Sequence, residues 1–355
     1  MGKTLKDIAE YYTNNCEKWS YYSIDDTDYN IDFVEKLEDG DKALDFIKDY
    51  FSIGGKEQAL AKIPQRLQKR TSGIRFVHTI STFLLGLKIA GCYGINVEFR
   101  NCSNMSFQYY WFLACLYHDI GYIYENDFSC KYLGMISVDG FEAIKKVCDI
   151  KYLNNSVFKT YSAEIVDIYL KCRARCVDGK CGVIDHGIVG GLLLYDALRK
   201  QFENAWKSKN DINLSRDSFY VFKGERQLHY SETHYKDYAK AADAIIAHNI
   251  WKNTLKKYLQ EYPHINSNSI PEKIYCKNEL CYILSIADTI EPLKRNPDYL
   301  DQVEFDFSKK DSFKIKTSKE IYNDVYKEIK SLSDWVDVDV TVSCGDQSEI
   351  TINKI

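Results

Sequence analysis

Proline is scarce in this chain, with five residues among 355, and we find no low-complexity segment and no internal repeat. Because proline removes a backbone donor and breaks helix interiors, its scarcity favours a mostly helical protein. The formal net charge of −4 gives no electrostatic reason to expect nucleic acid or an anionic membrane surface as a partner. A local basic pocket is still compatible with this sum, so nucleic acid is not expected but is not excluded.

Targeting segments are also missing. The first ten residues contain no apolar segment of signal-peptide length, and Lys6 stands where a myristoylation site at Gly2 would need Ser or Thr. No stretch approaches the roughly 18 consecutive apolar residues of a membrane span. We therefore expect a cytoplasmic protein that has no membrane partner.

The cysteines, twelve in all, are expected to be reduced thiols, because no export signal accompanies them. The tightest group is Cys172, Cys176 and Cys181. Its spacing lacks the paired C-x2-C knuckles of structural zinc sites, so ordinary thiols are favoured over a zinc site there.

Apolar residues recur at three- and four-residue spacing along most of the chain, which predicts one helix after another. The predicted helices are 74–90, 106–118, 140–150, 157–172, 186–203, 238–260 and 276–291, whereas 121–139 and 204–234 are polar and irregular. After Pro297, alternating apolar and polar residues predict strands at 303–307, 313–317, 336–342 and 350–355, with a helix at 318–332. We therefore predict a mainly α protein in three parts: a helical lead-in at 1–58 that packs on the core, a helical core at 59–296 and a small α+β appendage at 297–355.

One helical segment, 110–121, is apolar on every side until it ends in His118, Asp119 and Gly121. An imidazole and a carboxylate at the end of a buried helix are costly unless each has a partner, because buried charges must be paired or bound to a metal. A divalent cation would satisfy both groups at once.

Further polar residues are embedded in apolar helical segments of a chain that has only seven histidines. They are His78, His186, His248 and Asp288. Each has an ordinary explanation when taken alone. A single histidine is more often a hydrogen-bonded core residue than a ligand, Asp288 could cap a helix or pair with Arg295, and Asp185 could be an N-cap. What indicates a shared site is that several such residues recur in apolar helical segments of one chain.

The order of these residues, a histidine, a His-Asp pair and a distant aspartate, resembles that of the HD superfamily of metal-dependent phosphohydrolases. The residues that match are His78, His118, Asp119 and Asp288, and the resemblance covers about 70–295. It implies an HD-domain/PDEase-like multi-helix core with an insertion at about 121–185. His186 and His248 match positions that supply ligands to a second metal in the cyclic-nucleotide phosphodiesterase-like and HD-GYP branches.

The resemblance implies one ion held by His78, His118 and Asp288, and a second held by His186 and His248, with Asp119 bridging the two. Imidazole and carboxylate donors suit Mn, Fe, Ni, Co or Zn, whereas an all-oxygen set favours Mg or Ca. The implied reaction is hydrolysis of a phosphate ester by metal-bound hydroxide, on a small phosphorylated substrate with a nucleotide as the leading expectation. The candidate catalytic residues are Asp119, His118 and Arg75, where Arg75 either orients a ligand or contacts phosphate, or is a surface or ion-paired arginine.

The sequence also departs from the family. Tyr122 replaces the lysine that often follows His-Asp-Ile-Gly, which removes one common phosphate partner. No Gly-Tyr-Pro follows His248, which argues against cyclic di-GMP phosphodiesterase activity. Basic residues in the insertion either choose the substrate or are solvated at a helix end: Arg173, Arg175 and Lys180.

Two other functions stay open at this point: a di-iron oxygenase of the same superfamily, and a catalytically inactive regulatory module that binds a nucleotide or metal. The sequence does not choose between one and two ions. It does not identify the substrate, and a homo-oligomer is equally open.

Overall fold

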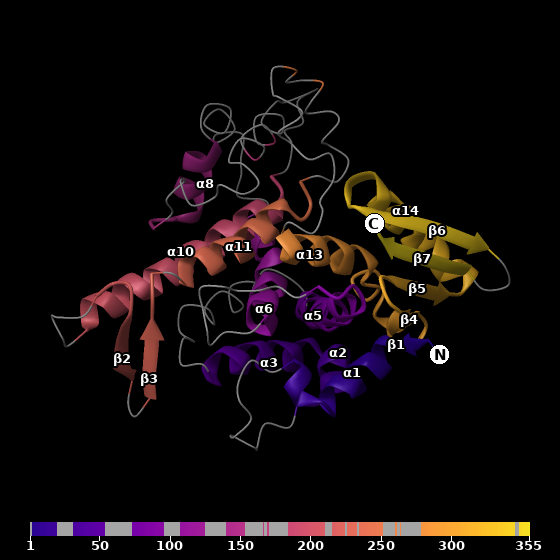
Figure 1. Cartoon of the computed structure of the whole chain (residues 1–355), viewed down its shortest axis with the longest axis horizontal. Coiled ribbons are helices and arrows are strands. Elements are labelled where there is room, and N and C mark those ends of the chain that lie inside the picture. Colours follow the sequence, from indigo (N-terminus) through magenta and orange to yellow (C-terminus); the bar gives the residue numbers. More distant parts are fainter. Residues whose placement is uncertain are drawn as a thin grey trace.

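The structure is a computed structural model of the chain, and it describes residues 2–19, 31–53, 73–95, 107–124, 140–152, 166, 169, 184–209, 215–223, 226–232, 234–250, 260, 263, 278–344 and 348–355. Helices fill the middle of the molecule, with a five-stranded sheet at one end and a two-stranded hairpin at the other (Figure 1). The prediction of a mainly α protein with a small C-terminal α+β part is confirmed. The identity of the core as an HD domain, and the boundaries near 58 and 296, stay predictions.

The centre of the molecule is the helix pair α5 (Ile74–Cys92) and α6 (Phe107–His118). Nearly the whole of α6 is buried, as expected for a segment that is apolar on every side. The two helices approach closely at Gly86, where a side chain would collide with the ring of Trp111. The indole Nε1 of Trp111 also donates to the carbonyl of Phe83 at 2.8 Å. This close packing fixes the positions of the two helices relative to each other.

Three further helices pack around this pair: α10 (His186–Ser208), α11 (His234–Ala247) and α13 (Glu279–Ile290). Gly190 lets α10 lie directly against α6, because a Cβ at this position would collide with the carbonyl oxygen of Tyr117. The start of α10 is thereby brought beside the C-terminal end of α6.

The N-terminal segment forms α1 (Leu5–Thr13), a 3₁₀ turn (Cys16–Lys18), α2 (Phe33–Glu38) and α3 (Gly40–Ile53), and these helices pack against α5. Their contact with the core is largely aromatic. Trp19, Phe33, Phe46 and Tyr50 form mainly edge-to-face pairs with one another, and Phe46 and Tyr50 reach the ring of Phe112 on α6. Aromatic pairs of this kind add to the stability that their burial provides.

The C-terminal segment follows the predicted alternation. It forms a 3₁₀ turn (Pro297–Asp301), β4 (Glu304–Lys309), β5 (Ser312–Thr317), α14 (Lys319–Trp335), β6 (Val338–Cys344) and β7 (Ser348–Lys354). The strand order is β1-β4-β5-β7-β6 with antiparallel pairing, and α14 packs between β6 and α13. The first strand, β1 (Lys3–Thr4), comes from the N-terminus, so both ends of the chain lie at this sheet (Figure 1).

The segment 204–234, predicted to be polar and irregular, is partly regular, and that prediction is wrong. The helix α10 continues to Ser208, and β2 (Phe219–Lys223) pairs antiparallel with β3 (Arg226–Tyr230). Phe219 stacks on Tyr230, and both rings contact Phe202 of α10. The overlooked signal is the aromatic and β-branched run at 219–222, which is typical of a strand.

The helix α8 (Gly140–Cys148) confirms the prediction for 140–150. Most of the predicted helix 157–172 and residues 251–259 lie outside the described residues. So do the residues for which zinc binding or substrate choice was considered: Cys172, Cys176, Cys181, Arg173, Arg175 and Lys180.

The helix α5 is long and apolar enough to cross a membrane, which the sequence analysis did not expect of any segment. Its most apolar window is 78% buried inside the protein. Burial of this extent is that of a core helix and is compatible with a soluble protein.

Candidate metal centre

The residues selected from the sequence meet where five helices converge. His78 lies on α5, His118 is the last residue of α6 and Asp119 follows it. The other three come from the remaining helices: His186 opens α10, His248 follows α11 and Asp288 lies on α13. All six are buried.

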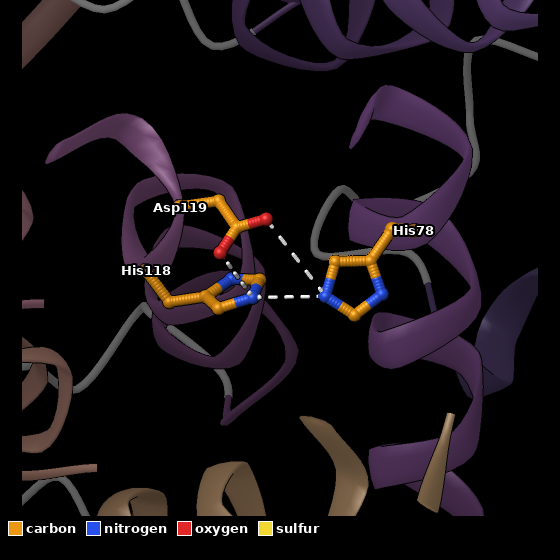
Figure 2. A group of neighbouring side chains, drawn as sticks. All are labelled: His78, His118 and Asp119. Atoms are coloured by element: carbon orange, nitrogen blue, oxygen red, sulfur yellow. Dashed lines mark hydrogen bonds and ion pairs between the residues drawn. The ribbon is translucent and has the colours of Figure 1, made fainter. Parts of the chain in front are cut away.

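Three of these side chains form a compact group, and Figure 2 shows His78 facing His118 and Asp119. The Nε2 atoms of His78 and His118 are 3.2 Å apart. Asp119 places Oδ1 3.2 Å from His118 Nε2 and Oδ2 3.9 Å from His78 Nε2. One donor atom of each residue lies within 4.8 Å of the others, so this buried group could hold a metal ion.

Asp288 brings a second carboxylate to the same place. Its Oδ1 is 3.1 Å from His78 Nε2 and 3.6 Å from His118 Nε2. The same oxygen accepts from the Lys294 ammonium at 3.0 Å. The pairing of Asp288 with Arg295 that the sequence allowed is not the one observed, because Arg295 binds backbone carbonyls and pairs with Glu328. Lys294 is thus a site residue that sequence reasoning missed.

His186 and His248 lie on the other side of Asp119. His186 Nε2 is 3.4 Å from Asp119 Oδ1, and the rings of His186 and His248 have their centroids 5.4 Å apart. The His248 ring is also 5.5 Å from that of His118. Oδ1 of Asp119 therefore lies between His118 and His186, whereas Oδ2 faces His78 and accepts from Arg75.

The ring orientations of two histidines are fixed by the helices that end in them. His118 Nδ1 is 2.6 Å from the carbonyl of Cys115, and His248 Nδ1 is 2.7 Å from the carbonyl of Ile245. The last turn of a helix leaves its carbonyls without intrahelical partners, so a ring three residues later can bond to one. A carbonyl can only accept, so each Nδ1 carries a proton, and in the neutral ring each Nε2 presents a lone pair to the cluster.

His78 is oriented by a carboxylate instead. Its Nδ1 is 2.7 Å from Oε2 of Glu291, which is completely buried. Glu291 also accepts from the Ser81 hydroxyl at 2.7 Å and from the backbone N–H groups of Leu293 and Lys294. Sequence reasoning missed Glu291, although it follows Asp288 by only three residues and directly follows the end of α13.

The histidines differ in charge. Burial opposes a charge on His78, but hydrogen bonds to Asp288 and Glu291 outweigh it and raise the pKa of His78 to about 9. Burial lowers the pKa of His186 and of His248 to about 4. A proton on His78 Nε2 is needed in this arrangement, since two lone pairs 3.2 Å apart would otherwise repel each other.

The carboxylates of the cluster are held ionised. Burial acts to raise the pKa of Asp119, but the surrounding imidazoles and the Arg75 guanidinium hold it well below its usual value. Burial opposes ionisation of Asp288 too, but the charge of Lys294 and the imidazoles of His118 and His78 beside it lower its pKa. The cluster thus keeps two anionic ligand groups at neutral pH.

Arg75 forms an ion pair, which was one of the alternatives left open for it. Its Nη1 donates to Asp119 Oδ2 at 2.9 Å, and its guanidinium lies 3.6 Å above the ring of Tyr122. Tyr122 also stacks on the ring of His186, with the ring centroids 4.0 Å apart and an interplanar angle of 15°. Tyr122, which lies in the 3₁₀ turn η2 (Ile120–Tyr124), therefore positions both an arginine and a candidate ligand.

The donor set combines imidazole nitrogens with carboxylate oxygens, which suits a transition-metal ion better than Mg or Ca. Comparisons of the chain with protein-family models, with curated proteins and with solved structures found no match. The function of the site is therefore inferred from its geometry.

Proposed function

We propose that this chain is a metal-dependent phosphohydrolase similar to the HD superfamily, and that it hydrolyses a phosphate ester of a small molecule, in the first place a nucleotide. One observation carries the proposal. His78, His118 and His248 each have Nδ1 bonded to a fixed acceptor, and the Nε2 atoms of His78 and His118 face the carboxylates of Asp119 and Asp288. Buried donors that converge in this way are costly for a core and are ready to bind a cation.

In this proposal His78, His118 and Asp288 would hold one ion and His186 and His248 a second, with Asp119 between them. The expected ions are Mn, Fe, Ni, Co or Zn, because these accept both imidazole and carboxylate. When bound, such an ion supplies a Lewis acid that activates water and neutralises charge on a phosphoryl group.

The two cationic side chains of the site favour an anionic substrate. The side chain of Arg75 is 31% exposed and that of Lys294 is 26% exposed, so both reach the edge of the cluster. Lys294 shares Asp288 Oδ1 with the histidines, and an ion that takes this oxygen leaves the ammonium available to a phosphate. Arg75, held flat on Tyr122, is suited to bidentate contact with phosphate and can replace the lysine that the family has at position 122.

The experiment that tests this function starts from protein purified without chelator. Metal content is measured by mass spectrometry, and phosphate ester hydrolysis is screened with Mn added, using p-nitrophenyl phosphate, bis-p-nitrophenyl phosphate and nucleotides. We expect one or two transition-metal ions per chain and release of product. We expect the activity in the cytoplasm, as the sequence predicts.

The matched variants are His118→Ala, within the cluster, and His229→Ala, in the hairpin. We expect His118→Ala to lose metal and activity and His229→Ala to keep both. Two irons without hydrolysis would move the assignment to the oxygenase branch. Absence of both metal and hydrolysis would favour a regulatory module and contradict the proposal.

A further inference from the structure

The side-chain amide of Asn249 lies against both histidines of the proposed second ion site. Its Nδ2 is 3.0 Å from His248 Nε2 and 3.4 Å from His186 Nε2. Asn249 directly follows His248 at the end of α11, so the backbone that positions the histidine also positions the amide.

The tautomer of His248 decides which group donates in the shorter contact, that between Asn249 Nδ2 and His248 Nε2. His248 Nδ1 carries its proton because it donates to the carbonyl of Ile245 at 2.7 Å, so His248 Nε2 is an acceptor. The amide of Asn249 therefore donates to the lone pair that a metal ion would use. A nitrogen lone pair cannot bind an N–H group and a cation at the same time.

The contacts of the other two histidines are different. The Nε2 atoms of His78 and His118 face each other and Oδ1 of Asp288, which is an anionic acceptor. A cation entering there gains a carboxylate, whereas a cation entering between His186 and His248 must first displace an amide donor. The two proposed ion sites thus differ in the interaction that an entering ion has to replace.

We propose that Asn249 is a positioning residue that competes with the second ion, so that the second ion binds more weakly than the first. This inference rests on the proposed function, because it needs a first ion at His78, His118 and Asp288. Its ligand class is a divalent transition-metal ion. Occupancy of the second site would then depend on metal concentration, and Asn249 would set the concentration at which it fills.

The test is calorimetric titration of the full chain with Mn after removal of bound metal, comparing wild type, Asn249→Ala, Asn249→Asp and the exposed control Asn14→Ala. Wild type should give two phases. In Asn249→Ala the second ion should bind about fivefold more tightly, which corresponds to one net hydrogen bond of about 1 kcal/mol, with the first phase unchanged. Asn249→Asp should tighten the second phase further because it adds a carboxylate.

Weaker second-ion binding in Asn249→Ala would mean that the amide oxygen is a ligand, and it would overturn the inference. Equal affinities in wild type and Asn249→Ala, or two ions of equal affinity in wild type, would overturn it as well. Wild-type protein that binds no first ion would instead contradict the proposed function. Circular dichroism and thermal melting of each variant show whether a changed second phase comes from a folded protein.

Discussion

The two halves of the histidine cluster are built differently. In the first half, His78, His118 and Asp288 come together with Glu291 and Lys294, so that charged groups surround the imidazoles. In the second half, His186 is stacked on Tyr122 and His248 is bonded to a backbone carbonyl and to the amide of Asn249. The raised pKa of His78 and the lowered pKa values of His186 and His248 follow this division.

This difference shows that one fold can build two chemically different sites from the same type of side chain, histidine. A cation entering the first half replaces a proton among the carboxylates of Asp119, Asp288 and Glu291, whereas one entering the second half meets two neutral rings and a single carboxylate, that of Asp119. Because carboxylates favour a cation far more than neutral groups do, we expect the first half to fill first. Asp119 has one oxygen toward His78 in the first half and the other toward His186 in the second.

The largest effect is expected for Asp119→Ala, which removes the connection between the halves. Both ions lose a ligand and Arg75 loses its partner, so bound metal and phosphate release should both fall below detection. Metal analysis and the hydrolysis assay measure this, with circular dichroism to establish folding. The control is Asp301→Ala, at an exposed position outside the cluster. Full metal occupancy in folded Asp119→Ala would disprove the assignment of Asp119.

Glu291→Gln should weaken the first half alone. The amide keeps the size of the carboxylate but loses the charge that orients the His78 Nδ1–H, and loss of such a partner typically costs about 10- to 100-fold in metal affinity. Competition with a chelator measures the first affinity, and the second phase of the titration is the internal reference. Ser81→Ala, which removes the other side-chain partner of Glu291, should have a smaller effect. An unchanged first affinity in Glu291→Gln would contradict the orienting role.

The pH dependence should also separate the halves. A histidine nitrogen binds metal only after losing its proton, so with a pKa of about 9 His78 must release one proton when the first ion binds at neutral pH. The affinity for the first ion should rise about tenfold per pH unit and level off above pH 9. The rings of His186 and His248 have pKa values of about 4, so they add no such pH dependence above neutral pH. Calorimetric titrations in buffers of different ionisation enthalpy measure how many protons are released when the first ion binds.

The same raised pKa has a consequence for folding without metal. A group whose pKa rises on folding contributes stability that is complete below its unfolded-state pKa of 6.5 and is lost as the pH rises through about 9. The free energy of unfolding, measured by denaturant titration of chelator-treated protein, should therefore contain a term that declines between these two pH values. A His78→Gln variant should lack that term. A first-ion affinity and a metal-free stability that are both independent of pH would show that His78 holds no proton.

Most helices and the C-terminal strands could be predicted because their apolar residues repeat with the period of the element. The hairpin at 219–230 was missed, since its first strand is aromatic on both faces and shows no clean alternation. For the candidate site, the buried His118 and Asp119 were visible because their apolar helix has no other reason to carry them. Lys294 and Asn249 were not selected, because nothing in their local sequence distinguishes them from ordinary helix-end residues, whereas the spacing of Glu291 from Asp288 was a signal that the sequence reasoning did not use.

The sequence by itself determined which residues are costly to bury and which helices carry them, because both depend on local composition and spacing. It also determined the local bonds of His118 and His248 to carbonyls three residues earlier, which any helix ending in histidine can make. Only the tertiary structure decided that His78 meets Glu291 across 213 residues, and that the amide of Asn249 lies between His186 and His248. Such contacts depend on how closely helices approach, which is set by small residues such as Gly86 and Gly190 at their crossings rather than by the residues of the site.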